Sequence, residues 1–484
     1  MIVIELLSIV FPFMTAFLAI DILWPKISSS KPQFYIKAYL AICLGLGLSS
    51  YTCFIGLLWY SPPPKTTIIF AESLLFSVFC LIYHFKTKRH IESKPTEKNR
   101  SLFVGVKPLL RTIYVFFIIS LASSAILFLL ISLNNPHGFW DAWAIWNLRA
   151  IFLVRSGHQI TSAFSKLIGW SHPDYPLLLP CIIAKIWTLL GNESLIVPIL
   201  IAFIFTFTSI GLLFSSLSYM QNQYQGLLAG LLILTVGSFV KLGADQIADV
   251  PIGLYYLATI IIYCIYHFEH EKSLHYIFLA GIMAGFATWT KNEGILFLLI
   301  VILTRFVIRF PHDGLRRFLK EMSVFLCGAA PIILLVIYFK IKFAPSNDII
   351  SGQGFQVTLS RLLDINRYLV VGKAFINEFY NMLHYRVIFI PLFIIFWGFS
   401  SNKHNRRGIQ NTIYILSFIL VGYFMVYIIT PHDLNWHLKT SLRRLFLQLL
   451  PSAIFLFFMA IANPNEAHGR KIPIVQFRSN RTKQ

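Results

Sequence analysis

The chain has 484 residues, of which 57% are hydrophobic and only 13% are charged. Soluble globular proteins carry about 25% charged residues, so this composition excludes an ordinary soluble domain and predicts apolar surfaces that face lipid. A net charge of +21 would suggest a nucleic-acid partner in a soluble chain. Here Lys and Arg lie between apolar segments, which is typical of the cytoplasmic loops of membrane proteins, so we expect no nucleic-acid partner.

Apolar segments long enough to cross a bilayer recur along the whole chain. A spanning helix needs about 20 mostly apolar residues, and lipid offers no hydrogen-bond partner to the backbone. The sequence therefore predicts an all-α polytopic membrane protein. We find thirteen candidate spans, at about 3–23, 35–59, 66–85, 112–133, 193–216, 225–242, 250–268, 273–289, 294–310, 322–343, 384–400, 410–430 and 443–461.

The distribution of Lys and Arg predicts the orientation. Four basic segments fall on one side if there are thirteen spans, and the positive-inside rule makes that side cytoplasmic and the N-terminus external. A further apolar segment, 174–190, would break this parity if it spanned. We expect it to be an interfacial helix within an external loop, 134–192, that also holds an amphipathic stretch at 140–155. The basic segments are 86–111, 305–320, 401–409 and the tail.

The external loop places an acidic residue just after the fourth predicted span. Asp141 lies in the segment FWDAWAIWN, among aromatic side chains. In such a partly dry position a carboxylate could accept a proton. It could equally be a helix N-cap. In the segment SHPDYPLLLP, His172 and Asp174 precede the next helix, and Asp174 fits a capping role better.

Two later external turns carry further charges. Asp245 and Asp249 are four residues apart, so on a helix they would share a face and need a cation or donor between them; a polar turn is the alternative. In TKNEG, at 290–294, Lys291 and Glu293 either neutralise each other or leave Lys291 to bind phosphate.

The segment 430–445 leads into the last span and holds His437, Arg443 and Arg444. Cations on the external side oppose the positive-inside rule, which favours anion binding, because Arg grips phosphate through two hydrogen bonds. Snorkelling to lipid headgroups is the alternative. No glycine-rich nucleotide loop and no metalloprotease or serine-hydrolase motif occurs in the chain.

Taken in order, these elements resemble the GT-C fold glycosyltransferases of family 39, which include the protein O-mannosyltransferases and the bacterial aminoarabinose transferase. The resemblance covers about 112–310. Ala142 follows Asp141 where many relatives have an Asp-Glu pair, three spans precede the usual first one, and the large C-terminal soluble domain of some relatives is missing. The resemblance is carried by Asp141 in a long external loop, the HPxxP-like element from His172 to Pro176, Asp249 with Asp245 nearby, and the TKxxG-like turn from Thr290 to Gly294.

The resemblance implies a membrane glycosyltransferase that moves a sugar, with inversion, from a polyprenyl-phosphate donor to a glycan, lipid or protein acceptor. The expected place is a bacterial inner (plasma) membrane with the active site on the periplasmic side. It implies no certain cofactor and leaves a divalent metal open. We expect Asp141 as base, Asp249 and Asp245 as further acidic groups, Lys291, Arg443 and Arg444 at the donor phosphate, and His172, Asp174, Glu293 and His437 toward the acceptor.

The chain then divides into three N-terminal spans with a basic loop (1–111), a GT-C-like catalytic core (112–310), C-terminal spans (311–462) and a basic tail (463–484). Two other readings stay open. A lipid or solute transporter or flippase would use the same charged residues as ion or substrate sites. An O-antigen ligase-type or polymerase-type enzyme would also use lipid-linked sugars.

Overall fold

The computed structural model describes residues 2–24, 31–60, 63–88, 108–155, 157, 159–269, 271, 273–347, 354–383, 389–400 and 403–462. The basic tail and most of the 86–111 loop lie outside these ranges. The described residues form helices and no strand, apart from one isolated bridge between Phe399 and Ile461. The predicted all-α fold is therefore confirmed.

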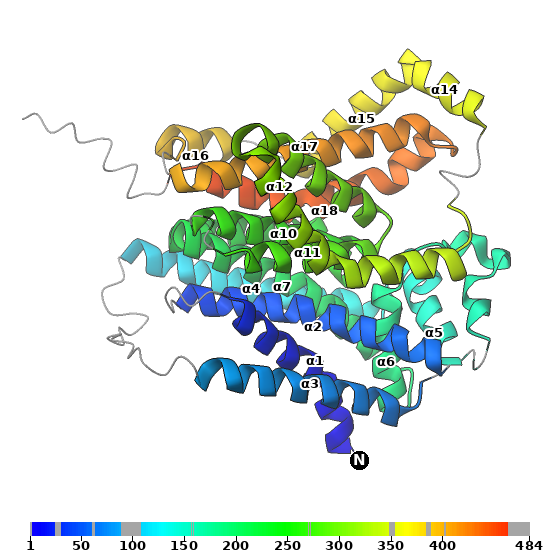
Figure 1. Ribbon diagram of the computed structural model, residues 1–484. Coiled ribbons are helices and arrows are strands. Elements are labelled where there is room, and N and C mark those ends of the chain that lie inside the picture. The colour runs from blue at the N-terminus through cyan, green and yellow to red at the C-terminus, as the bar shows by residue number, and fades with distance from the viewer. Residues whose placement is uncertain are drawn as a thin grey trace, which may run out of the picture.

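Every one of the thirteen predicted spans overlaps a helix (Figure 1), although residues 384–388 of the span predicted at 384–400 lie outside the described residues. Among the described residues, eight helices are long and apolar enough to cross a membrane, or nine if α8 and α9, which are bent by 68° at their junction, form one span. The other predicted spans correspond to α1, α11, the first part of α12 and α16, so the full count stays a prediction. The helices are α1 Ile2–Leu23, α2 Lys31–Trp59, α3 Lys65–Lys88, α4 Pro108–Asn134, α5 Asn147–Arg155, α6 Leu178–Leu190, α7 Ile196–Met220, α8 Gln223–Thr235, α9 Gly237–Ala244, α10 Asp249–Phe268, α11 His275–Thr290, α12 Glu293–Lys342, α14 Phe355–Leu363, α15 Ile365–Leu383, α16 Phe389–Trp397, α17 Lys403–Ile429 and α18 Leu434–Ala460.

Helix α10 forms the centre of the bundle, and nearly all of its side chains are buried. It packs against α7, α11, α17 and α18. Gly253 lets α18 approach closely, because a Cβ at that position would lie 2.7 Å from the carbonyl oxygen of Gln448. This contact brings the first turn of α10 beside the middle of α18, which positions the charged residues described below.

The external loop folds into short helices rather than an open coil. A π-helical turn, Ala142–Trp146, continues into α5, so the first predicted amphipathic stretch is helical. Arg149 of α5 is buried and donates to the carbonyl oxygens of Ala163 and Ser171, which fixes the two 3-10 turns, Ile160–Phe164 and Lys166–Ser171. The second stretch becomes α6, whose 13 residues are short for a span.

A buried ion pair ties α6 to the N-terminal helices. The ammonium of Lys185 contacts the carboxylate of Glu72 on α3 and lies 3.0 Å from the hydroxyl of Ser49 on α2. Both charged side chains are almost completely buried. Because an unpaired charge is costly in an apolar surrounding, this pair links α2, α3 and α6.

A second charged network lies at the other end of α10, where α10, α12 and α17 meet. Glu321 accepts from Arg305 and Tyr266 and lies 3.5 Å from Nε of Arg317, and Glu271 accepts from Arg317. Glu271 also contacts His267 and Arg407. We call these residues the inner network; it joins three helices at the end where the sequence predicts the cytoplasm.

Candidate active site at the start of α10

Charged side chains from four distant segments meet at the start of α10. The guanidinium of Arg444 on α18 lies 2.5 Å from Oδ2 of Asp141 and 2.9 Å from Oδ2 of Asp249. The ammonium of Lys291 lies 3.1 Å from Oδ1 of Asp249 and 2.7 Å from Glu293. We call these five residues the acid cluster; its carboxylates outnumber its cations by one.

The two aspartates of the cluster differ in how their oxygens are used. Asp249 accepts from Lys291 and from Gln448 at Oδ1 (2.5 Å), and from Arg444 at Oδ2 (3.0 Å). Asp141 accepts from Arg444 at Oδ2, and no donor among the described residues reaches its Oδ1. Its side chain is 12% exposed, against 1% for Asp249. Asp141 therefore keeps an oxygen able to take a proton, whereas Asp249 holds the cations in place.

Asp141 does not act as a helix cap. The residue precedes the π-helical turn, but its side chain accepts no hydrogen bond from that turn. Its backbone is already helical, with φ −61° and ψ −34°, whereas a capping residue ordinarily has extended backbone. The capping alternative is therefore not what the geometry shows.

Lys291 lies in a surrounding that keeps its ammonium charged. Burial alone would lower the pKa of this group, but the carboxylates of Asp249 and Glu293 outweigh burial and raise the pKa of Lys291 above its ordinary value. The ammonium also lies 5.9 Å from the centre of the Tyr175 ring. A fixed positive charge at this position suits an anionic ligand.

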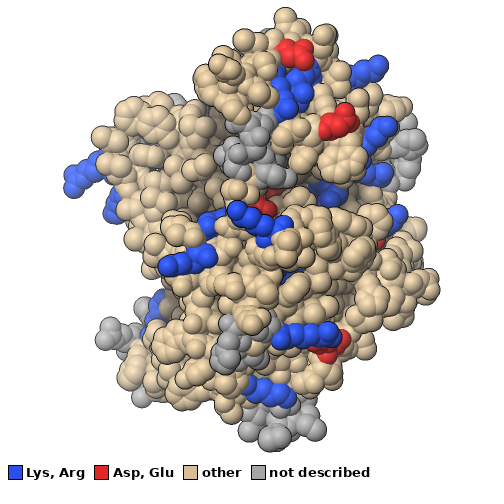
Figure 2. Space-filling view, turned by 90° about the vertical axis from the view of Figure 1, so that its right-hand side faces the viewer, with Lys and Arg blue, Asp and Glu red and all other residues tan. Residues whose placement is uncertain are grey.

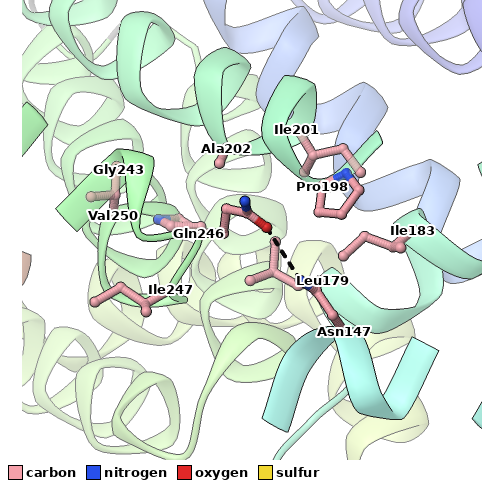
Figure 3. Close-up of a pocket in the computed structure, with 11 residues that line it drawn as sticks. Asn147, Leu179, Ile183, Pro198, Ile201, Ala202, Gly243, Gln246, Ile247 and Val250 are labelled. Carbon is pink, nitrogen blue, oxygen red and sulfur yellow. Dashed lines mark hydrogen bonds between the residues drawn. The ribbon is translucent and has the colours of Figure 1, made fainter. Parts of the chain in front are cut away.

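Hydrogen bonds between two loops bring Asp141 to Asp249. The backbone N–H of Phe139 donates to the carbonyl oxygen of Asp245 (3.1 Å), and the side-chain amide of Gln246 donates to the carbonyl oxygen of Pro136 (3.0 Å). The amide of Asn147 donates to Gln246 (3.2 Å), as the dashed line in Figure 3 shows. The small cavity beside this pair has a volume of about 10 Å³, which is room for about one water.

Asp245 itself lies outside the acid cluster. Its carbonyl oxygen takes part in the loop contact, but no hydrogen bond joins its carboxylate to a described residue. The side chain is buried, and burial raises the pKa of this carboxyl above its ordinary value. The structure therefore separates Asp245 from Asp249, although they are close in sequence.

Asp174 belongs to a second polar group next to the acid cluster. Its Oδ2 accepts from the side chains of Asn292 (2.7 Å) and Asn347 (2.8 Å). Lys340 donates to the backbone oxygen of Asp174 (2.5 Å) and to Oδ1 of Asn292 (2.7 Å). Asp174 does not cap α6, whose N-cap is Leu177, so the capping role that we favoured from the sequence is wrong.

His172 reaches the site through a stack of rings. Its ring centre lies 5.0 Å from that of Tyr175, and the Tyr175 ring centre lies 5.6 Å from that of Trp146. His172 has φ +48°, an uncommon value for a residue with a side chain. The backbone N–H of Tyr175 donates to the carbonyl oxygen of His172 (3.0 Å), so the turn joins His172 to the ring that lies near Lys291.

The structure does not bring Arg443 or His437 into the cluster. The Arg443 side chain is 59% exposed and lies 3.9 Å from Glu378 on α15. His437 lies 2.9 Å from the hydroxyl of Thr430 and packs against Tyr427. Of the two adjacent arginines, Arg444 alone faces Asp141 and Asp249.

Sequence reasoning missed several polar members of the site. Gln448 is the clearest case. It is a single amide within the apolar segment 443–461, and such a residue usually faces the bundle interior, so the sequence did contain a signal for it. Lys340, Asn292 and Asn347 gave no comparable signal, since polar residues are ordinary near the ends of membrane helices. Within the described part of the chain, no three His, Cys, Asp or Glu side chains are placed to hold one metal ion.

Comparison with known protein families gave a match, which covers the middle of the chain. A model of the family described as dolichyl-phosphate-mannose-protein mannosyltransferase matches residues 172–339. The predicted resemblance is confirmed over this segment. The match indicates a multi-pass membrane glycosyltransferase. Comparison with curated proteins and with solved structures gave no match.

The matched segment contains Asp174, Asp249, Lys291 and Glu293. It leaves out Asp141 and Arg444, which join this group only through the folded structure. The part of the site that the family model covers is thus completed by one residue that precedes it and one that follows it.

Proposed function

We propose that this protein transfers a sugar from a polyprenyl-phosphate donor to an acceptor hydroxyl at the external face of the membrane, with inversion at the sugar carbon. The observation that carries the proposal is the position of Arg444 between Asp141 and Asp249. A group-transfer site of this kind needs a base for the acceptor and cations for the leaving phosphate. Both lie within one cluster.

The leaving group of this reaction is a lipid phosphate, which needs nearby positive charge. As the bond between the sugar carbon and the phosphate oxygen breaks, the electron pair stays on the lipid phosphate, whose charge increases. Lys291 and Arg444 would stabilise this charge, because fixed cations in a partly dry site cost no reorganisation. Asp249 holds both of them through hydrogen bonds, which pre-positions the two cations.

The acceptor needs a proton acceptor on the opposite side of the sugar carbon. In this proposal, the acceptor oxygen attacks that carbon and its proton passes to Oδ1 of Asp141. Asp141 suits this role better than Asp249, whose oxygens already accept three donors. The protonated carboxyl then returns its proton to water when the product leaves.

Access to the cluster is from the end of the bundle that carries the external loop. Figure 2 shows this face, with acidic atoms lying deep between basic side chains near its middle. The second polar group, from Asp174 to Lys340, lies beside it and would contact the acceptor or the hydroxyl groups of the sugar. The basic residues around the opening favour anionic ligands over cationic ones.

Reconstituted protein would test this function directly. Proteoliposomes are given a polyprenyl phosphate carrying a radiolabelled sugar, together with lipid, glycan and peptide acceptors. We expect the label to move to an acceptor while unglycosylated lipid phosphate accumulates, and the anomeric configuration of the product, measured by NMR, to be opposite to that of the donor. Label that crosses the bilayer on intact donor would instead support a flippase.

A further inference from the structure

A large groove lies between α2, α4 and α7. Its volume is about 540 Å³, within the range of small-molecule and cofactor sites, roughly 300–1,000 Å³. Most of its wall is apolar or aromatic and comes from parts of α2, α4 and α7 that are apolar enough to span the membrane. Phe117 and Phe214 stack across it with ring centres 5.4 Å apart.

Charge is confined to one end of the groove. Lys31 at the start of α2 and Arg111 in the first turn of α4 both line it, and no Asp or Glu does. The same wall includes the tyrosines Tyr35, Tyr39 and Tyr114. Neither Lys31 nor Arg111 has a carboxylate partner among the described residues. The groove therefore combines a cationic mouth with a long apolar floor.

This groove is separate from the acid cluster. Arg111 lies in the first turn of α4, whereas Asp141 follows the last turn of that helix. Helix α4 has 27 residues, and at 1.5 Å per residue the two ends are about 40 Å apart. One phosphate cannot contact both places, so the groove is not the donor-phosphate site proposed above.

We propose that the groove binds an anionic glycerophospholipid, with its phosphate at Lys31 and Arg111 and an acyl chain along the wall near Phe117 and Phe207. Basic pockets between membrane helices bind anionic headgroups by direct charge attraction. On the topology predicted from Lys and Arg, this mouth faces the cytoplasmic leaflet. The amide of Gln223 and the tyrosine hydroxyls supply further donors to the headgroup.

Native mass spectrometry of the purified protein would test the site. Delipidated protein is titrated with phosphatidylglycerol, or with phosphatidylcholine of identical acyl chains. We expect Lys31→Ala/Arg111→Ala to weaken phosphatidylglycerol binding about 30-fold, because each basic residue near an anionic lipid contributes about 1 kcal/mol. Binding of phosphatidylcholine should change little. The matched control is Arg316→Ala/Lys320→Ala, which removes two exposed cations outside the groove and should leave both lipids unaffected.

A second variant tests the apolar floor. Ile204 lines the groove and is partly exposed, so Ile204→Trp would fill it and should reduce binding of both lipids. Equal binding of phosphatidylglycerol by the wild type and by Lys31→Ala/Arg111→Ala would overturn the proposal. So would preferential retention of polyprenyl phosphate over phosphatidylglycerol in this groove.

Discussion

The two ends of α10 each carry a charged network, and the networks differ in whether their carboxylate oxygens are all in use. In the inner network, both oxygens of Glu321 and both of Glu271 have a donor or charged partner. In the acid cluster, Asp141 keeps Oδ1 without a donor from the described residues. The carboxylate oxygens of the inner network are all in use, whereas the acid cluster keeps one that is not.

This difference separates a structural from a chemical role. A saturated ion-pair network fixes helices relative to one another and offers nothing to a ligand. A cluster with an unused oxygen and two fixed cations can exchange partners when an anionic substrate enters. Burial and ion pairing alone would not have distinguished the two, because Arg305 and Lys291 are both buried. The predictions below compare matched changes at the two ends.

The largest effect is expected for Asp141→Asn. The amide keeps the shape but cannot take the acceptor proton, so transfer should fall by about 10²–10⁴-fold, the usual contribution of a general base. Initial rates in proteoliposomes at equal protein measure it, and yield and membrane insertion should not change.

Asp433→Asn is the matched control, because Asp433 does cap a helix: its side chain accepts from the backbone N–H of Trp436 at the start of α18. Asn caps as well as Asp, so this variant should transfer normally. If Asp141→Asn behaves like Asp433→Asn, Asp141 is not the base.

Arg444→Met is expected to lower transfer by about 10²–10³-fold, the cost of losing one preorganised donor to a developing charge. The apparent affinity for donor lipid should fall as well. Both are obtained from initial rates over a range of donor concentrations. A variant with normal transfer and normal donor affinity would remove Arg444 from the phosphate site.

Arg305→Met makes the same substitution in the inner network. Glu321 keeps Tyr266 as a donor and the partly exposed Arg317 as an ion-pair partner. It loses its buried cation, and removal of one member of a buried pair is strongly destabilising. We expect the thermal unfolding midpoint in detergent to fall by several degrees, while transfer per folded molecule stays within about threefold. Loss of transfer without loss of stability would mean that the two networks do not divide the roles as described.

The helices could be predicted from the sequence, because an apolar segment in lipid has no other way to satisfy its backbone. The number of spans could not. Helix α11 has 16 residues and α6 has 13. Both are near or below the shortest length that crosses a bilayer. For helices of this length, composition alone does not distinguish a short span from an interfacial helix.

The acid cluster was predicted residue by residue but not as a unit. Asp141 and Arg444 are 303 residues apart, and no local pattern encodes that contact. Asp174 shows the opposite failure, since its position before a helix favoured a cap, yet its side chain contacts Asn292 and Asn347 instead. Local rules identify which charges are unusual, whereas tertiary packing decides which of them meet.

The smallest effect is expected for Asp245→Asn. Burial raises the pKa of Asp245, so the folded protein binds this proton more tightly than the unfolded chain does. Stability is therefore lost as pH rises from the unfolded pKa, about 3.9, through the folded pKa, and the loss persists at neutral pH. Asn carries no charge and avoids that loss, so the variant should be as stable as the wild type at pH 7 or more stable. Thermal unfolding from pH 4 to 8 measures this difference in stability, and the two proteins should converge toward the acidic end.

The rate of sugar transfer by Asp245→Asn should stay within about twofold of the wild type, because the loop contact uses the carbonyl oxygen of Asp245, which Asn retains. A fall of two orders of magnitude would place the Asp245 carboxylate in the chemistry and would move the boundary of the active site beyond the acid cluster.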